Sequence, residues 1–216
     1  TMIRNLTSGD ALRWVNTGGN NIIRNLFAPS NKAVMGFQTA TVDSSTIKGI
    51  QIIENSRHLG IYNGYIYADA TLSAAVSVEA GNELVQLDAY STVFIPLLAA
   101  DRAFDGKFVT GLFLTNPFFD DPNNVATGVF GSNFGPVSGN ITLTLMGGAV
   151  KTPADPPWNP PSGVDVNYVN FVPKSGVFEN SGVLGSTKLT GQGNTVLTGS
   201  CDPTASTTLV GVGTRF

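Results

Sequence analysis

The sequence contains few charged residues. Asp, Glu, Lys and Arg make up 12% of the 216 residues, and the formal net charge is −3. A typical soluble domain carries about twice this charged fraction. Because the basic residues are few and scattered, the sequence does not indicate a protein that binds nucleic acid directly. The deficit is typical of a subunit whose faces lie against neighbours, or whose surface carries Thr, Asn and Ser in place of Lys and Glu.

Cysteine and histidine are almost absent. Cys201 and His58 are the only residues of their types. One cysteine excludes an intrachain disulfide, and a structural zinc site needs more Cys and His ligands than the chain has. No Ser or Cys stands in the sequence context of a nucleophile elbow, so His58 does not indicate a hydrolase. We expect no cofactor and no bound metal ion.

The carboxylates do not form a recognisable catalytic pattern. Sequence spacing allows a glycosidase-like pair to be drawn from Asp88, Asp101, Asp105, Asp120 and Asp121. All of these except Asp88 lie in turn-like stretches, where Asp is a common turn former. The loop 120–124 offers oxygen ligands that suit Ca²⁺ weakly, without an EF-hand pattern. The pieces 191–193 and 211–213 lack the Lys of a phosphate loop, so we predict a protein that is not an enzyme.

Long hydrophobic runs are also lacking. No apolar stretch approaches the ~20 residues of a transmembrane helix. The first residues, TMIRNLTSGDALRW, do not contain the apolar core of a signal peptide. We therefore expect a protein without a membrane span that is made in a cytoplasm.

Glycine, proline and short β-branched runs are abundant. With Gly 25 and Pro 12, the composition predicts many short strands joined by turns. Apolar residues are densest between 84 and 114. There, 92–95 reads as a strand that ends at Pro96, and 108–114 alternates with apolar residues on both sides. The second pattern predicts a strand that is covered on both faces.

Two dipeptides predict tight turns. Asp105-Gly106 is expected to join the two strands of the 92–114 stretch as a hairpin, and Asn63-Gly64 is expected to form a type I′ hairpin turn. The alternative for 83–98 is a helix with Leu84, Leu87 and Tyr90 on one face, although the run 91–96 argues against it.

Further strands are predicted from apolar and β-branched runs. The stretch 47–53 has isoleucines on both faces and is expected to be buried on both sides, whereas 141–145 alternates and is expected to have one wet face. The other predicted strands are 34–42 and 72–78.

Four regions follow from the composition. Residues 1–32 form a polar N-terminal arm, in which Arg4-Asn5-Leu6 and Arg24-Asn25-Leu26 are too short a match to define a repeat. Residues 33–150 form the main β domain. Residues 151–161 contain five prolines and form an extended linker. Residues 162–216 are rich in Gly, Ser and Thr and form a C-terminal arm or a small β extension.

Part of the chain resembles a known family. The segments 46–55, 76–81, 87–98 and 141–145 are similar to a pattern in small structural proteins of tailed bacteriophage particles. The Gln-Gly-Tyr element of that family's strand end is missing here, and long additions flank the similar region, which is roughly 46–146. The resemblance implies a β-sandwich of jelly-roll type that serves in a virion shell, in its decoration, or in its vertex and tail attachments.

Together these observations predict an all-β protein. We expect an antiparallel β-sandwich of jelly-roll type with extended N- and C-terminal arms. Its expected function is that of a noncatalytic virion structural protein that binds copies of itself and other virion proteins. The predicted interface residues are Trp14, Phe27, Phe118, Phe119, Trp158, Phe171 and Phe178.

The alternative is a carbohydrate- or receptor-binding module of a phage particle, because β folds commonly host sugar sites. In that case a surface glycan is the partner. The stacking faces for it would come from Trp14, Tyr62, Tyr65, Tyr67 and Trp158.

Overall fold

The computed structural model describes residues 2–4, 12–15, 19–68, 72, 74–98, 100–120, 129–151, 161, 163–169, 188–192 and 208–212. Within these ranges the chain forms strands and turns, and no helix. The strands belong to three sheets, and all strand pairings between them are parallel. The predicted antiparallel β-sandwich of jelly-roll type is therefore wrong, although the all-β class is confirmed.

The three sheets differ in length. Sheet A contains β1 (Met2–Arg4), β3 (Asn20–Arg24), β6 (Thr39–Asp43), β9 (Ser56–Tyr62), β12 (Leu84–Tyr90), β15 (Lys107–Thr115), β18 (Ile141–Met146), β20 (Val164–Val169), β21 (Lys188–Gln192) and β22 (Thr208–Val212), with β17 (Gly135–Pro136) beside β15. Sheet B contains β4 (Phe27–Ala28), β7 (Thr46–Lys48), β10 (Tyr65–Tyr67), β13 (Val93–Ile95), β16 (Phe118–Asp120) and β19 (Ala149–Lys151). Sheet C contains β2 (Leu12–Val15), β5 (Ala33–Gly36), β8 (Ile50–Ile52), β11 (Ala74–Val78) and β14 (Arg102–Asp105).

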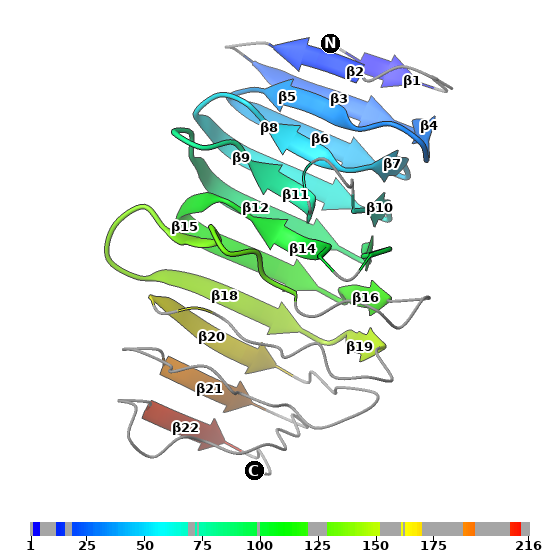
Figure 1. Cartoon of the computed structure of the whole chain (residues 1–216). Helices are drawn as coiled ribbons and strands as arrows, with labels where there is room; N and C mark the ends of the chain where they lie inside the picture. The colour runs from blue at the N-terminus through cyan, green and yellow to red at the C-terminus, as the bar shows by residue number, and fades with distance from the viewer. Residues whose placement is uncertain are drawn as a thin grey trace.

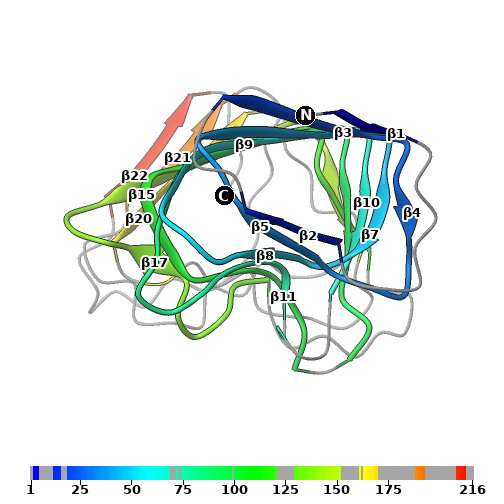
Figure 2. The same ribbon diagram turned by 90° about the horizontal axis from the view of Figure 1, so that it is seen from above.

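The chain visits the three sheets in turn and coils along one axis. One full turn runs through β5, β6 and β7, and the next runs through β8, β9 and β10. Figure 1 shows the strands stacked from β1 to β22, and Figure 2 shows the three sheets around a common interior. This arrangement is a parallel β-helix, in which each turn pairs with the turns above and below it.

The length of a turn changes along the coil. In sheet A the partner of residue 20 is residue 39, and the partner of 39 is 58, so both steps are 19 residues. Later steps are longer, with 28 residues from 58 to 86, 25 from 86 to 111 and 31 from 111 to 142. The extra residues lie in loops between sheets, because the strands themselves keep their register.

The interior is built from rows of apolar side chains that run along the axis. Each strand places alternate residues inward, and parallel register stacks equivalent positions in adjacent turns. The central row of sheet A consists of Ala40, Leu59, Leu87, Leu112, Leu143 and Val166, all of them buried. Full burial of one such Leu or Val stabilises the fold by roughly 1.5–3 kcal/mol.

Phenylalanines fill the middle turns. Phe94, Phe104 and Phe119 come from β13, β14 and β16, and their ring centroids are 4.8–6.1 Å apart. Phe130 and Phe134 extend this cluster toward Phe108 of β15 at 4.6 and 5.3 Å. The rings therefore tie the three sheets together through one contact network.

A row of left-handed residues turns the chain from sheet A to sheet B. Asn25, Ser44, Asn63, Ser91 and Asn116 all have φ between 47° and 52°. Each follows the last residue of a sheet A strand, and its N–H donates to the carbonyl of the equivalent residue in the next turn, for example Asn63 to Tyr90 O at 2.9 Å. Asn tolerates this conformation better than most residues, and Ser is less usual there.

The two predicted hairpins are wrong because the turns connect different sheets. Asn63 has φ of 51°, but it links β9 of sheet A to β10 of sheet B, and Gly64 has no positive φ. Gly106 has the expected positive φ of 101°, yet it links β14 of sheet C to β15 of sheet A. The strand end at Ile95 before Pro96 is confirmed. The alternative helix at 83–98 is contradicted by β12 and β13.

Burial on both faces has a different cause from the predicted one. The stretch 47–53 is two strands, separated by Gly49 with φ of 84°. Ile47 points inward from sheet B, and Ile50 and Ile52 point inward from sheet C, so all three are buried in one interior. The stretch 34–42 is likewise divided between β5 and β6.

The prediction for 108–114 is also corrected. Phe108, Leu112 and Leu114 are buried, but Val109 and Phe113 are exposed on the outer side of the strand. The register shifts where Leu84 and Gln86 of β12 meet β15, and Val109 and Thr110 are both exposed at this irregularity. A β-bulge of this kind interrupts the inside–outside alternation.

Two predicted strands are confirmed, and the regions at the ends join the same sheets. Residues 74–78 form β11, and 141–146 form β18 with alternating burial. β3 and β4 pair with later strands, and β18 pairs with β20 on the far side of the proline-rich segment. Residues 152–160 lie outside the described residues, and the predicted division into arms, domain and linker stays a prediction.

Candidate functional site

The outer face of sheet A presents an ordered grid of side chains. Because the strands are parallel and in register, each outward position forms a row along the coil axis. We call these rows the first, middle and third row, in the direction of the strands. The first row contains Asn20, Thr39, His58 and Gln86. The middle row contains Ile22, Thr41, Gly60, Asp88 and Phe113, and the third row contains Arg24, Asp43, Tyr62, Tyr90, Thr115 and Met146.

A groove follows the first row. It has a volume of about 390 Å³ and is lined by one pair of residues from each of four neighbouring strands: Gly19 and Asn20, Gln38 and Thr39, Arg57 and His58, and Val85 and Gln86. The groove, which we call the axial groove, therefore runs along the coil and across the strands. Three strand spacings make it roughly 14 Å long. Its volume lies in the range of small-ligand sites.

Asp88 organises the polar side chains beside the axial groove. Its Oδ2 lies 2.9 Å from His58 Nε2, and its Oδ1 accepts a hydrogen bond of 2.8 Å from Gln86 Nε2. The His58 and Asp88 side chains are 34% and 33% exposed. With both carboxylate oxygens engaged, Asp88 fixes the orientation of an imidazole and an amide that remain accessible to a ligand.

Tyr62 forms a flat platform on the same face. A Cβ placed on Gly60 would lie 2.8 Å from Tyr62 Cε2 and 3.2 Å from the hydroxyl oxygen, so the ring lies across the backbone of Gly60. The residue is still 36% exposed, and its neighbour Tyr90 in the third row is 47% exposed. Because Gly60 has no side chain, the ring rests against the sheet and offers its other side to solvent.

The two arginines of this face have different surroundings. Arg24 Nε lies 3.1 Å from Asp43 Oδ2 in an exposed ion pair of the third row. Arg57 lines the axial groove, is exposed, and has no carboxylate within ion-pair distance among the described residues. The guanidinium of Arg57 is therefore the more available of the two for a ligand.

Of the predicted aromatic residues, several are placed and do not form one site. Phe27 of β4 is exposed and Phe118 of β16 is half-buried on sheet B, whereas Phe119 is buried in the phenylalanine cluster. Trp14 lies on β2 in register with Met35. Trp158, Phe171 and Phe178 lie outside the described residues. The use of these residues as an interface stays a prediction.

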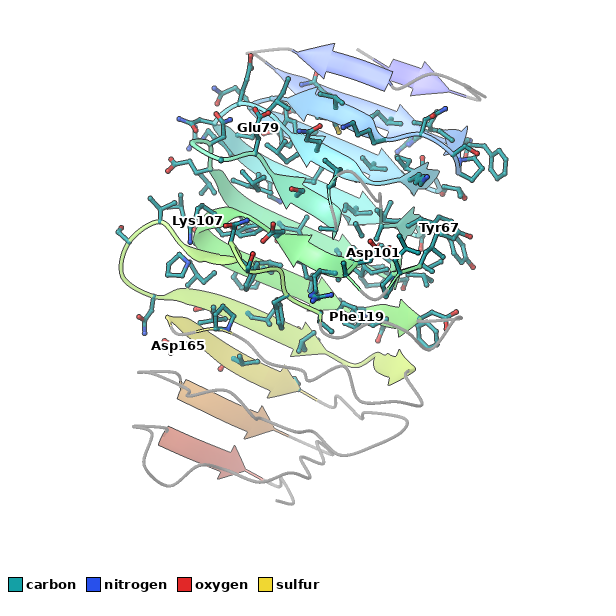
Figure 3. All side chains as sticks on the ribbon, viewed as in Figure 1. Tyr67, Glu79, Asp101, Lys107, Phe119 and Asp165 are labelled. Carbon is teal, nitrogen blue, oxygen red and sulfur yellow. The ribbon has the colours of Figure 1, made fainter. Side chains whose placement is uncertain are left out.

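The predicted stacking residues are divided between two sheets. Tyr62 belongs to the outer face of sheet A, whereas Tyr65 and Tyr67 follow the corner at Asn63 and belong to sheet B. Figure 3 shows Tyr67 at the sheet B edge, at the opposite side of the view from Glu79 and Lys107. Only Tyr62 of these three therefore stands beside the polar first row.

Sequence reasoning missed the group around Asp88. His58 and Asp88 were considered separately, because 30 residues separate them in the chain. The signal that would have joined them is the recurring turn residue after each sheet A strand, which sets the register of neighbouring turns. Counting back from Asn63 and Ser91 places His58 and Gln86 at the same position of their strands.

Metal and membrane features add no further site. Within the ranges that the structure describes, no three His, Cys, Asp or Glu side chains gather as metal ligands. Asp120 ends β16, and the rest of the proposed calcium loop, 121–124, falls outside these ranges. No helix in the described part of the chain has the length and apolar character needed to cross a membrane.

The comparisons with known proteins give no relative. A scan against protein-family models, a search of curated proteins and a search of solved structures each found no significant match. The function is therefore argued from the fold and from the outer face of sheet A.

Proposed function

We propose that the protein binds an extended carbohydrate chain on the outer face of sheet A, with the sugar chain parallel to the coil axis. The axial groove carries the proposal, because each of four strands contributes a pair of lining residues to it. The spacing between neighbouring strands, about 4.8 Å, is close to the length of one sugar ring in an extended chain. A linear glycan would thus meet a similar environment at each ring.

The chemistry of the lining suits a ligand rich in hydroxyl groups. Amide and hydroxyl groups come from Asn20, Gln38, Thr39 and Gln86, and an imidazole comes from His58. Such groups both donate and accept hydrogen bonds, as sugar hydroxyls do. Tyr62 adds an exposed ring face against which the apolar side of a sugar can stack.

We propose binding without chemistry. Of the carboxylates in the grid, Asp88 is held by His58 and Gln86, and Asp43 is paired with Arg24. Glycoside hydrolysis needs one carboxyl to donate a proton while another attacks or activates water. The glycan recovered after incubation with the protein is expected to have its original mass.

A glycan array followed by calorimetry on the best oligosaccharide tests this proposal. Tyr62→Ala is expected to weaken binding by about three- to tenfold, because it removes one stacking contact of roughly 0.5–1.5 kcal/mol. Tyr65→Ala is the matched control, since Tyr65 is 51% exposed but lies on sheet B. Absence of any glycan binding, or an equal loss in both variants, would contradict the proposal.

The second candidate is the structural role in a virion that the family resemblance implied. It is favoured by an apolar strip on the outer side of sheet B, where Phe27, Tyr65, Val93 and Phe118 occupy equivalent positions of successive turns. Phe27 is 55% exposed. Exposed apolar rows of this kind are typical of protein–protein contacts, and the occupant that we propose is a second copy of the chain.

A further inference from the structure

We infer that the glycan bound in the axial groove is acidic, with isolated carboxylate groups among neutral sugars, and that Arg57 binds the carboxylate. The inference rests on the proposed function and specifies its ligand. It follows from which charges line the groove and which do not.

The axial groove has a cationic lining in an acidic protein. The chain has 15 acidic and 12 basic residues, yet none of the eight residues that line the groove is Asp or Glu. Arg57 and His58 are the basic residues of the lining, and they come from the same strand end. The carboxylate beside them, Asp88, accepts from Gln86 and contacts His58, so it does not neutralise Arg57.

Arg57 has the geometry for a carboxylate. A guanidinium presents its N–H groups as a planar fork that matches the two oxygens of a carboxylate, and it keeps its charge at all physiological pH values. The comparison with Arg24 is informative, because Arg24 already uses Asp43 as its partner. Arg57 has no such partner among the described residues, so a ligand carboxylate would supply it.

The number of cations limits the charge density of the ligand. One guanidinium serves a groove that crosses four strands, and the other lining pairs are Gly19 with Asn20, Gln38 with Thr39, and Val85 with Gln86. A chain with an acid on every sugar would place further carboxylates against neutral side chains and near Asp88, where like charges repel. A chain with one acid among several neutral sugars avoids this cost.

Nucleic acid is the less suitable polyanion. Its phosphates recur at every nucleotide, and its binding depends on several Lys or Arg contacts at once. The net charge of −3 and the single available guanidinium do not provide them. A single-stranded oligonucleotide therefore serves as a negative control in the experiment.

Calorimetry with paired ligands tests the inference. The acidic probe is a set of gellan oligosaccharides, in which each repeating unit carries a single glucuronate. The matched neutral probe is the same material after its carboxyl groups have been reduced to alcohols. We expect the acidic form to bind up to about fivefold tighter, the effect of one exposed ion pair, and we expect added salt to reduce the difference.

Variants assign the effect to one residue. Arg57→Gln is expected to bind both forms equally and with the affinity of the wild type for the neutral form. Arg57→Lys should retain part of the preference, because it keeps the charge and loses the fork. Arg24→Gln is the matched control and should keep the full preference, since Arg24 is engaged with Asp43.

The outcomes separate this inference from the proposed function. Equal binding of both probes by the wild type would overturn the acidic ligand and leave carbohydrate binding intact, whereas binding of no glycan at all would overturn both. Loss of the preference in Arg24→Gln but not in Arg57→Gln would overturn the assignment to Arg57. Tighter binding of oligogalacturonate, of a sulfated glycan or of the oligonucleotide than of the gellan probe would overturn the isolated carboxylate.

Discussion

At the scale of single residues, a few turn positions decide how the chain coils. Asn63 illustrates this, because its left-handed conformation lets its N–H reach Tyr90 O of the next turn while the chain changes from sheet A to sheet B. The same role belongs to Ser44 and Asn116 in other turns. Local sequence therefore indicated correctly that 63–64 is a turn, but it did not indicate which sheet follows.

Glycine is required where a turn or bulge brings two backbones together. Gly111 has φ of 143°, and a Cβ at this position would overlap the carbonyl oxygen of Thr142 in the adjacent strand. We expect Gly111→Ala to lower the free energy of unfolding by on the order of 3 kcal/mol, since backbone strain and steric overlap act together. Chemical denaturation monitored by circular dichroism measures the change.

The control for this prediction is Gly81→Ala. Gly81 has a positive φ of 87°, but nothing lies within 4 Å of a Cβ placed there. This variant should lose only the conformational contribution, about 1–2 kcal/mol. Equal destabilisation of the two variants would show that contact with Thr142 is unimportant.

At the scale of strands, the inward rows carry most of the stability. Leu59 lies in the central row of sheet A between Ala40 and Leu87 and is fully buried. Leu59→Ala should lower the free energy of unfolding by about 3 kcal/mol, because it removes buried methyl groups and leaves a cavity. The matched control is Val109→Ala on the exposed side of β15, which should change it by less than about 0.5 kcal/mol. A smaller loss for Leu59→Ala than for Val109→Ala would refute the assignment of inward and outward rows.

The sequence predicted strands better than it predicted their partners. Alternation at 141–146, the strand end before Pro96 and the turns at Asn63 and Gly106 were all recognisable, because each depends on neighbouring residues. Which strand pairs with which depends on residues 19 to 31 positions away. An Asn-Gly pair between two short strands fits a hairpin and a β-helix corner equally well, so the antiparallel prediction had no local evidence against it.

The site was hidden for the same reason. Arg4 pairs with Arg24, so the two short phrases that looked unrelated are at equivalent positions of neighbouring turns. Had this spacing of 20 residues been used as a repeat, Thr39, His58 and Gln86 would have appeared as one row. The contact between His58 and Asp88 depends on that row and on side-chain orientation, and sequence alone shows neither.

At the scale of the whole molecule, the outer side of sheet B bears on assembly. If a second copy covers the apolar strip there, the chain forms oligomers, and Phe27→Ser should shift the population toward monomer because Phe27 is its most exposed aromatic ring. Native mass spectrometry at several concentrations measures the shift. Phe113→Ser, on the outer face of sheet A, is the control and should leave the oligomer unchanged. A wild-type chain that is monomeric at all concentrations would contradict the second candidate function.

The crosswise orientation of the strands also determines how the molecule responds to force. Hydrogen bonds between turns point along the coil axis, so tension on the two ends loads one turn before the next rather than shearing a whole sheet at once. Stretched in this way, the chain should yield in a series of small extensions. A turn of 19 residues releases at most roughly 65 Å of extended chain, which would let the molecule lengthen like a spring while its remaining turns stay wound.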